Sequence, residues 1–73
     1  MDGKTALQEL CAARGLSSPE YEVTESGPDH DKSFTAAAVI SNEKFEIGEG
    51  KSKREAEQAA AKLAYDILNA RTS

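Results

Sequence analysis

The chain has 73 residues, of which 38% are hydrophobic and 30% are charged, and its net charge is −4. This length suits one small domain near the lower limit for a self-sufficient hydrophobic core. We expect no membrane span, since no apolar run is long enough, and no signal peptide, since the first residues show no cationic segment followed by an apolar one. One cysteine and one histidine exclude an internal disulfide and a Cys/His zinc site, and this cysteine usage suits a reducing cytosol.

The first predicted element is a short helix over residues 5–14. Its apolar stripe consists of Leu7, Leu10 and Cys11, extended by Arg14. A second stripe is mostly polar and consists of Thr5, Gln8, Glu9 and Ala12. Gly15 is placed to end the helix as its C′ residue.

Three short strands are predicted to follow. Pro19 favours an extended backbone, after which Tyr21 and Val23 alternate with polar residues in a first strand. Turn chemistry in residues 26–29 leads to a second strand over residues 34–40. A short connection at residues 41–43 then leads to a third strand, marked by Phe45 and Ile47. Such short links predict antiparallel pairing.

A second helix is the clearest predicted element. Ser52 followed by Glu55 matches the capping box, so we expect this helix to begin at Ser52. Its apolar residues follow helical spacing over three turns, and they are Ala56, Ala59, Ala60, Leu63, Ala64, Ile67 and Leu68. The alanines should let the helix lie close on the sheet, with Leu63 and Ile67 filling the wider end. Residues 71–73 are expected to fray.

Positive charge is concentrated at the start of this second helix. Residues 1–50 carry four cations against ten acids, whereas residues 51–73 carry five cations against three acids. Lys51, Lys53 and Arg54 stand where free backbone N–H groups and the helix dipole already favour an anion. Cations do not stabilise this end of a helix, so their presence indicates a phosphate ligand, in a nucleotide or a nucleic acid.

Four segments, in this order and with these gaps, resemble a double-stranded RNA-binding domain, specifically the C-terminal one of bacterial ribonuclease III. They are Lys4-Thr5-Ala6-Leu7-Gln8-Glu9, then Pro19-Glu20-Tyr21, then Gly27-Pro28-Asp29-His30 with Phe34-Thr35-Ala36, and finally the segment from Gly48 to Ala61. The resemblance implies an α+β fold of the order α-β-β-β-α, with two helices on one face of a three-stranded antiparallel sheet. It also implies a single domain over residues 1–73, with a core at residues 4–69.

The resemblance further implies three regions of RNA contact, and each has a plainer alternative. The first is Thr5, Gln8 and Glu9 in one minor groove, and the second is His30 in the next minor groove. The third is Lys51, Lys53 and Arg54 on the phosphates across the major groove between them. The alternatives are a solvated helix face, an exposed loop histidine, and cations that only keep the helix start soluble.

Ala12 departs from the pattern of the resembled family, and Glu57 differs from its eukaryotic members. Many members carry a longer polar residue where Ala12 stands, so that contact is expected to be missing. Glu57 stands where eukaryotic members often carry another cation, although the ribonuclease III type commonly has Glu there. Asp29 and Asp31 also place negative charge beside His30.

No pattern of carboxylates predicts a catalytic centre or a metal site in this chain. The resemblance implies a non-catalytic module that binds double-stranded RNA without a cofactor, and whose parent enzyme carries a Mg²⁺-dependent nuclease domain elsewhere. We expect a cytoplasmic protein, a monomeric isolated domain and a homodimeric parent. The alternative is a module of the same fold that serves protein interaction or dimerisation. A KH domain is not supported, because no Gly-x-x-Gly loop occurs. An RRM is not supported either, because it needs exposed aromatic side chains on its sheet, whereas Phe34 and Phe45 are predicted in the core.

Overall fold

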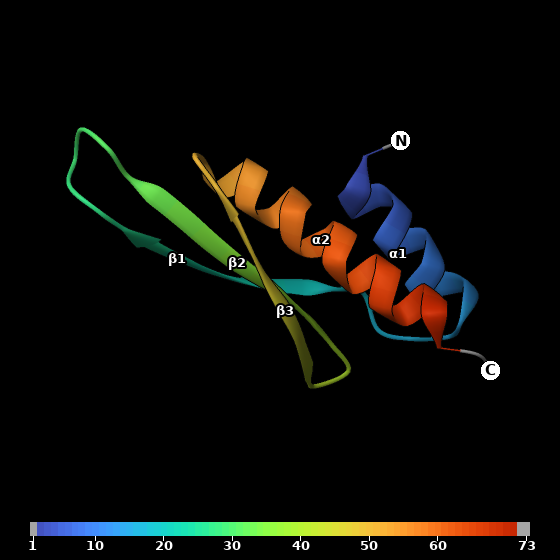
Figure 1. Cartoon of the computed structure of the whole chain (residues 1–73). Coiled ribbons are helices and arrows are strands. Elements are labelled where there is room, and N and C mark those ends of the chain that lie inside the picture. Colours follow the sequence, from blue (N-terminus) through green and yellow to red (C-terminus); the bar gives the residue numbers. More distant parts are fainter. Residues whose placement is uncertain (1, 72–73) are drawn as a thin grey trace.

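The computed structural model describes residues 2–71, which form two helices and three strands (Figure 1). In chain order these are α1 (Gly3–Ala13), β1 (Glu20–Ser26), β2 (Ser33–Ile40), β3 (Glu43–Gly50) and α2 (Lys53–Ala70). The strands make one antiparallel sheet in the order β1-β2-β3. In Figure 1, α2 lies across one face of this sheet and α1 lies beside α2. The predicted α-β-β-β-α fold is confirmed.

Both helices begin at a residue whose side chain caps free backbone N–H groups. Asp2 Oδ1 accepts a hydrogen bond from the Lys4 N–H at 2.8 Å, so α1 begins at Gly3, two residues before its predicted start. Gly15 follows α1 with φ +69°, as expected of a C′ glycine. Ser52 is the cap of α2, which confirms the prediction from the capping box.

A bulge in β3 reverses the alternation of its side chains. Between the pairs Ala37–Ile47 and Val39–Lys44, β2 contributes one residue and β3 contributes two. Phe45 therefore faces the helices and is only 7% exposed, whereas Ile47 is 57% exposed. Simple alternation from Phe45 would have put Ile47 in the core.

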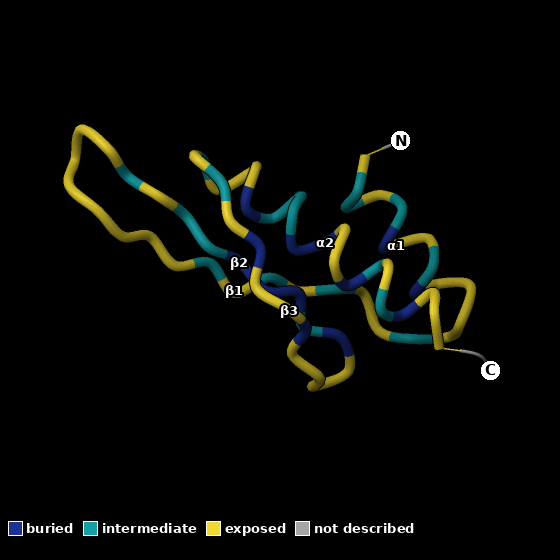
Figure 2. Tube along the Cα trace, in the orientation of Figure 1, coloured by how far each residue is buried: buried dark blue, intermediate teal, exposed yellow. Residues whose placement is uncertain are grey.

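The core lies where α2 crosses the sheet and α1 leans against α2 (Figure 2). Its main cluster consists of Leu7, Cys11, Ala38, Ile40, Phe45, Ala61, Ala64 and Leu68. The prediction that Leu63 fills the wider end is wrong, since Leu63 is 38% exposed while Ala64 and Leu68 on the same helix are buried. Ile67 is half-buried against this cluster, and Phe34 is half-buried against a second cluster around Ala36.

The start of α2 lies against the backbone of β3 with no room for a side chain between them. A Cβ atom on Gly48 would lie 2.4 Å from the Ala60 nitrogen, and one on Gly50 would lie 2.6 Å from the Ala56 nitrogen. Glycine at these two positions and alanine on the facing helix allow this close approach. The position of the helix start is therefore set by backbone contact with the sheet.

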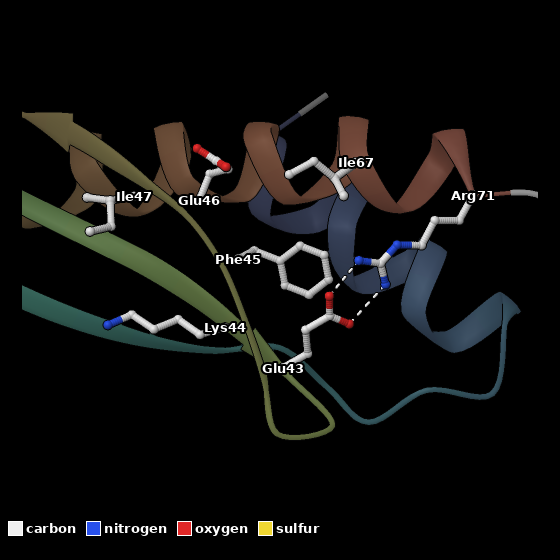
Figure 3. Close-up of a pocket in the computed structure, with 7 residues that line it drawn as sticks. All are labelled: Glu43, Lys44, Phe45, Glu46, Ile47, Ile67 and Arg71. Atoms are coloured by element: carbon white, nitrogen blue, oxygen red, sulfur yellow. Dashed lines mark hydrogen bonds and ion pairs between the residues drawn. The ribbon is translucent and has the colours of Figure 1, made fainter.

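The other end of α2 is tied to β3 by an ion pair. Arg71 donates to both carboxylate oxygens of Glu43, one at 2.9 Å, and its guanidinium lies 5.2 Å from the centre of the Phe45 ring (Figure 3). The hydrogen bond from Arg71 lowers the pKa of the Glu43 carboxyl. The expectation that residue 71 frays is wrong for this reason, while residues 72 and 73 lie outside the described residues.

Candidate nucleic-acid interface

The first predicted contact region is on the solvent side of α1. Thr5, Gln8 and Glu9 are exposed, whereas Leu7 and Cys11 of the same helix are buried. Burial of these two apolar side chains decides which face of the helix is turned outward. The hydroxyl, amide and carboxylate groups of α1 are thus all accessible to a ligand, as the sequence predicts.

An open groove joins the start of α1 to the start of α2. Its volume is about 490 Å³ and its lining includes Thr5 and Gln8 from α1 and Arg54 from α2. Asp2, Lys4, Glu57 and Gln58 complete the lining, and Glu9 is not part of it. The structure thus brings two of the predicted minor-groove residues and one of the predicted phosphate residues to the same hollow.

The second predicted region is the loop of residues 27–32, which carries His30 at an exposed position. A turn closes around it, since the Asp31 N–H donates to the Pro28 carbonyl at 2.9 Å. Gly27 has φ +93°, and a Cβ there would lie 2.6 Å from the Asp31 carbonyl oxygen, so the turn requires glycine. Residues 27–31 are exposed, and the loop projects from one end of the molecule (Figures 1 and 2).

Each of the two acids that flank His30 lies near a cation. Asp31 Oδ1 is 3.6 Å from Lys51 Nζ, and Asp29 Oδ1 is 3.9 Å from Lys32 Nζ. Exposed pairs of this kind contribute at most about 1 kcal/mol each. They nevertheless offset the negative charge that these acids would present to a bound anion, and the Asp31–Lys51 pair links the loop to the start of α2.

The third predicted region is the capped start of α2. Ser52 Oγ accepts from the Glu55 N–H at 3.1 Å, and Glu55 Oε1 accepts from the Lys51 N–H at 3.2 Å. These two hydrogen bonds fix the chain that carries the basic residues. Lys53 and Arg54 are exposed and make no ion pair with any residue in the range 2–71. They are the cations most available to a phosphate.

The three regions follow one another along one edge of the molecule. In Figure 1 the tip of the β1–β2 loop, the start of α2 and the start of α1 all lie along the upper edge. The longest dimension of the molecule is 44 Å. The structure thus presents two polar regions at a fixed separation, with a basic region between them.

Lys4 and Glu57 interact at this interface, and reasoning from the sequence missed their interaction. Lys4 Nζ lies 2.7 Å from Glu57 Oε1 and 5.2 Å from the centre of the Tyr21 ring. The Lys4 N–H also donates to Gln58 Oε1 at 3.2 Å. These partners are 53 and 54 residues away along the chain, so no local pattern could reveal them.

Two titratable groups beside Lys4 have shifted pKa values. A hydrogen bond with the Gln58 side chain, and a second with the Lys4 backbone, lower the pKa of the Asp2 carboxyl. Burial, together with the negative charge of Glu57, raises the pKa of Tyr21 to about 12. The Tyr21 hydroxyl is buried and has no hydrogen-bond partner among the described residues.

Within residues 2–71 we find no group of three or more His, Cys, Asp or Glu side chains placed to hold a metal ion. The same part of the chain contains no helix that is long and apolar enough to cross a membrane.

Comparison with protein families and known sequences places the chain among RNA-binding modules. The family described as "Double-stranded RNA binding motif" matches residues 4–68. Ribonuclease 3 of Nocardia farcinica is 56% identical over 70 residues, which are 96% of this chain and 29% of that protein. Ribonuclease 3 of Streptomyces coelicolor is 54% identical over 70 residues, which are 96% of this chain and 25% of that protein. The chain thus spans less than a third of the length of these relatives.

Solved structures agree with the sequence comparisons. Arabidopsis HYL1, described for its implications in miRNA processing, superposes with a TM-score of 0.82 at 28% identity, over 94% of this chain and 99% of that chain. A structure of both double-stranded RNA-binding domains of DRB4 superposes with a TM-score of 0.74 at 34% identity, over 96% of this chain and 46% of that chain. The α-β-β-β-α arrangement described above is therefore shared with these domains.

Proposed function

Because the chain belongs to the double-stranded RNA-binding motif family, we propose that it binds duplex RNA through the edge formed by α1, the β1–β2 loop and the start of α2. The observation that carries the proposal is the groove that Thr5 and Gln8 share with Arg54. Polar groups for a minor groove and a cation for a phosphate stand there in one rigid unit. Domains of this type span about 16 bp through two minor grooves and the phosphates between them.

The shape of A-form RNA explains the division of labour. Its minor groove is wide and shallow and displays 2′-hydroxyls, while its major groove is too deep and narrow for side chains to read. The Gln8 amide can donate to and accept from a 2′-hydroxyl, and the Glu9 carboxylate can accept a hydrogen bond from it. His30 can do the same in the next minor groove while neutral. DNA lacks this hydroxyl, so these contacts select RNA.

The basic start of α2 supplies affinity without reading sequence. Lys51, Lys53 and Arg54 would contact phosphates across the major groove, where the free N–H groups and dipole of α2 also favour negative charge. Cation–phosphate contacts release counterions and depend on salt, but carry no sequence information directly. The module should therefore recognise duplex shape with little preference for sequence.

The proposal extends to the protein in which such a module acts. Since the named relatives are ribonucleases and the chain matches less than a third of their length, the chain would serve as the substrate-binding module of a ribonuclease III-like endonuclease. The hydrolytic domain of that parent would use Mg²⁺, and this domain would need no cofactor. The parent would be a cytoplasmic homodimer and the isolated domain a monomer. The single cysteine, Cys11, is free and buried, which is compatible with that compartment.

The proposal is tested by titrating the protein with three labelled ligands at one salt concentration: an RNA duplex, a DNA duplex of the same sequence, and one strand of the RNA. We expect the RNA duplex to bind with the highest affinity, since only this ligand offers both A-form shape and paired 2′-hydroxyls. Fluorescence anisotropy measures all three. Equal affinity for the two duplexes would contradict the role given to Gln8, Glu9 and His30.

A second candidate function is dimerisation through β3. This strand is at the edge of the sheet, and its Ile47 is 57% exposed. Beside it lies a pocket of about 610 Å³, lined by residues 43–47 with Ile67 and Arg71 (Figure 3). An exposed edge strand can pair with a second chain. Sedimentation across a range of protein concentrations, with and without Ile47→Lys, would reveal such a dimer and assign it to this edge.

A further inference from the structure

The shortest polar contact between the two helices at the interface is the Lys4–Glu57 ion pair. Lys4 Nζ and Glu57 Oε1 are 2.7 Å apart, and the two side chains are only 40% and 23% exposed. It is the shortest and least exposed Lys–carboxylate pair among residues 2–71. Partly buried, hydrogen-bonded charge pairs are stronger than surface pairs, so this pair can hold α1 in a fixed position relative to α2.

Two further contacts lock Lys4 to the same place. Its ammonium group lies 5.2 Å from the centre of the Tyr21 ring, at a distance suited to a cation–π interaction. Its backbone N–H donates both to Asp2 Oδ1 at 2.8 Å and to Gln58 Oε1 at 3.2 Å. The first turn of α1 is thus joined to α2 through Glu57 and Gln58, and to β1 through Tyr21.

The neighbours of this cluster are the residues that would touch RNA. Thr5 follows Lys4, and Arg54 is one helical turn before Glu57 and Gln58. Thr5, Gln8 and Arg54 line the same groove as the Lys4–Glu57 pair. A change in the pair would therefore alter the separation between the polar groups of α1 and the cations of α2.

We propose that Lys4 and Glu57 are positioning residues, whose ion pair sets the separation between the minor-groove contacts of α1 and the phosphate contacts of α2. This inference rests on the proposed function and deepens it. The pair acts by holding α1 in register with α2, and neither side chain takes a phosphate as its main partner. Glu57 thus increases RNA affinity even though its own charge repels RNA.

The sign of one substitution separates positioning from simple charge. Glu57→Leu removes a negative charge at the interface, so charge alone would raise RNA affinity. If Glu57 positions α1, the same change lowers affinity, by about fivefold for a contact of this kind. A matched control is Glu22→Leu, because Glu22 pairs with Lys44 at 3.1 Å between β1 and β3, outside the three contact regions. The control should leave affinity unchanged or slightly higher.

Lys4 is tested by the salt dependence of binding. Lys4→Met should lower affinity by about the same factor as Glu57→Leu while leaving the slope of log K against log salt unchanged. A slope flatter by about one unit would instead mean that Lys4 binds phosphate directly, and would overturn the inference. Lys4→Arg keeps the ion pair and should keep wild-type affinity. Lys44→Met is the matched control for the loss of a lysine.

The double variant Lys4→Glu with Glu57→Lys keeps the net charge and can restore the pair. We expect the double variant to bind duplex RNA more tightly than Lys4→Glu alone or Glu57→Lys alone. If it binds no more tightly than these single variants, the coupling between Lys4 and Glu57 is refuted. The unfolding midpoints of all variants show whether a loss of affinity results from unfolding of the domain. If a single variant is unfolded, the affinity of the folded double variant still tests the coupling. If the wild type fails to bind duplex RNA, the proposed function fails. If the wild type binds and Glu57→Leu binds as well or better, only this inference fails.

Discussion

Lys53→Ala and Arg54→Ala should each flatten the salt dependence of duplex-RNA binding. Both side chains are exposed at the first two positions of α2, and neither has an ion-pair partner within the described range. Each is therefore free to contact a phosphate and to release the counterion condensed there. Loss of one such contact lowers the magnitude of the slope of log K against log salt by about 1.

The wild-type slope can be worked out from the ion pairs. A neutralised phosphate contributes about −0.9 in B-DNA, and with the same value for duplex RNA the two unpaired cations Lys53 and Arg54 give about −1.8. Lys51 is held only loosely, at 3.6 Å from Asp31, and both side chains are at least 70% exposed. Exchange of this weak pair for a phosphate adds up to about −0.9 more. We therefore expect a wild-type slope between about −2 and −3.

The assay is anisotropy with one RNA duplex at four or more salt concentrations, repeated for each variant. Lys62→Ala is the control on the same helix, since Lys62 lies beyond the helix start and 3.7 Å from Asp66. It should leave the slope unchanged. Gln8→Ala should lower affinity at every salt concentration without changing the slope, because a neutral amide displaces no counterion. Circular dichroism would confirm that each variant is folded.

An unchanged slope in both Lys53→Ala and Arg54→Ala would refute this reasoning. The basic cluster would then be a solvated surface, and the dimerisation function suggested by β3 would become the better account. A wild-type slope much steeper than −3 would show that cations outside the start of α2 contact phosphates.

Gly48→Ala should destabilise the fold by about 1–3 kcal/mol or more in a thermal melt, because the new Cβ would lie 2.4 Å from the Ala60 nitrogen. Gly15→Ala would meet no atom within 4 Å, so it should cost only the strain of alanine at a φ of +69°, about 1–2 kcal/mol. Since the folded pKa of Tyr21 is about 12 against an ordinary 10, its contribution to stability is present below pH 10 and is lost as pH rises through 12. Tyr21→Phe should remove this alkaline loss, as urea midpoints at about pH 8 and about pH 11 would show. Incubation of the protein with long duplex RNA and Mg²⁺ should give no cleavage on a gel, and products that persist after repurification would contradict the non-catalytic role.

Local patterns predicted the parts of the fold that depend on local physics. The Ser52 cap, the C′ role of Gly15 and the exposed face with Gln8 all follow from spacing within one helix. The resemblance to a family then identified the loop at His30 and the cations at the start of α2 as candidate contacts. The structure confirms that these residues are exposed, whereas their contact with RNA stays a prediction.

Features that depend on distant parts of the chain could not be predicted. The bulge in β3 is a property of its pairing with β2, so the exposure of Ile47 could not be read from alternation. Leu63 fits the apolar pattern of α2, yet it is 38% exposed, because which flank of a helix is covered depends on the elements packed against it and not on the spacing within the helix. The Lys4–Glu57 pair joins two helices at opposite ends of the sequence, and one sequence carries no record of such a contact.

The close contact of Gly48 and Gly50 with α2 has a consequence for the entropy of binding. When a recognition segment becomes ordered only on binding, the conformational entropy that it loses reduces the free energy of binding. Here the backbone that carries Lys53 and Arg54 is already immobilised against β3 before any ligand arrives. The cost of ordering is then confined to the long side chains themselves, at about 0.5–1.5 kcal/mol each. A protein with few cations and a net negative charge can thereby convert most of each phosphate contact into affinity.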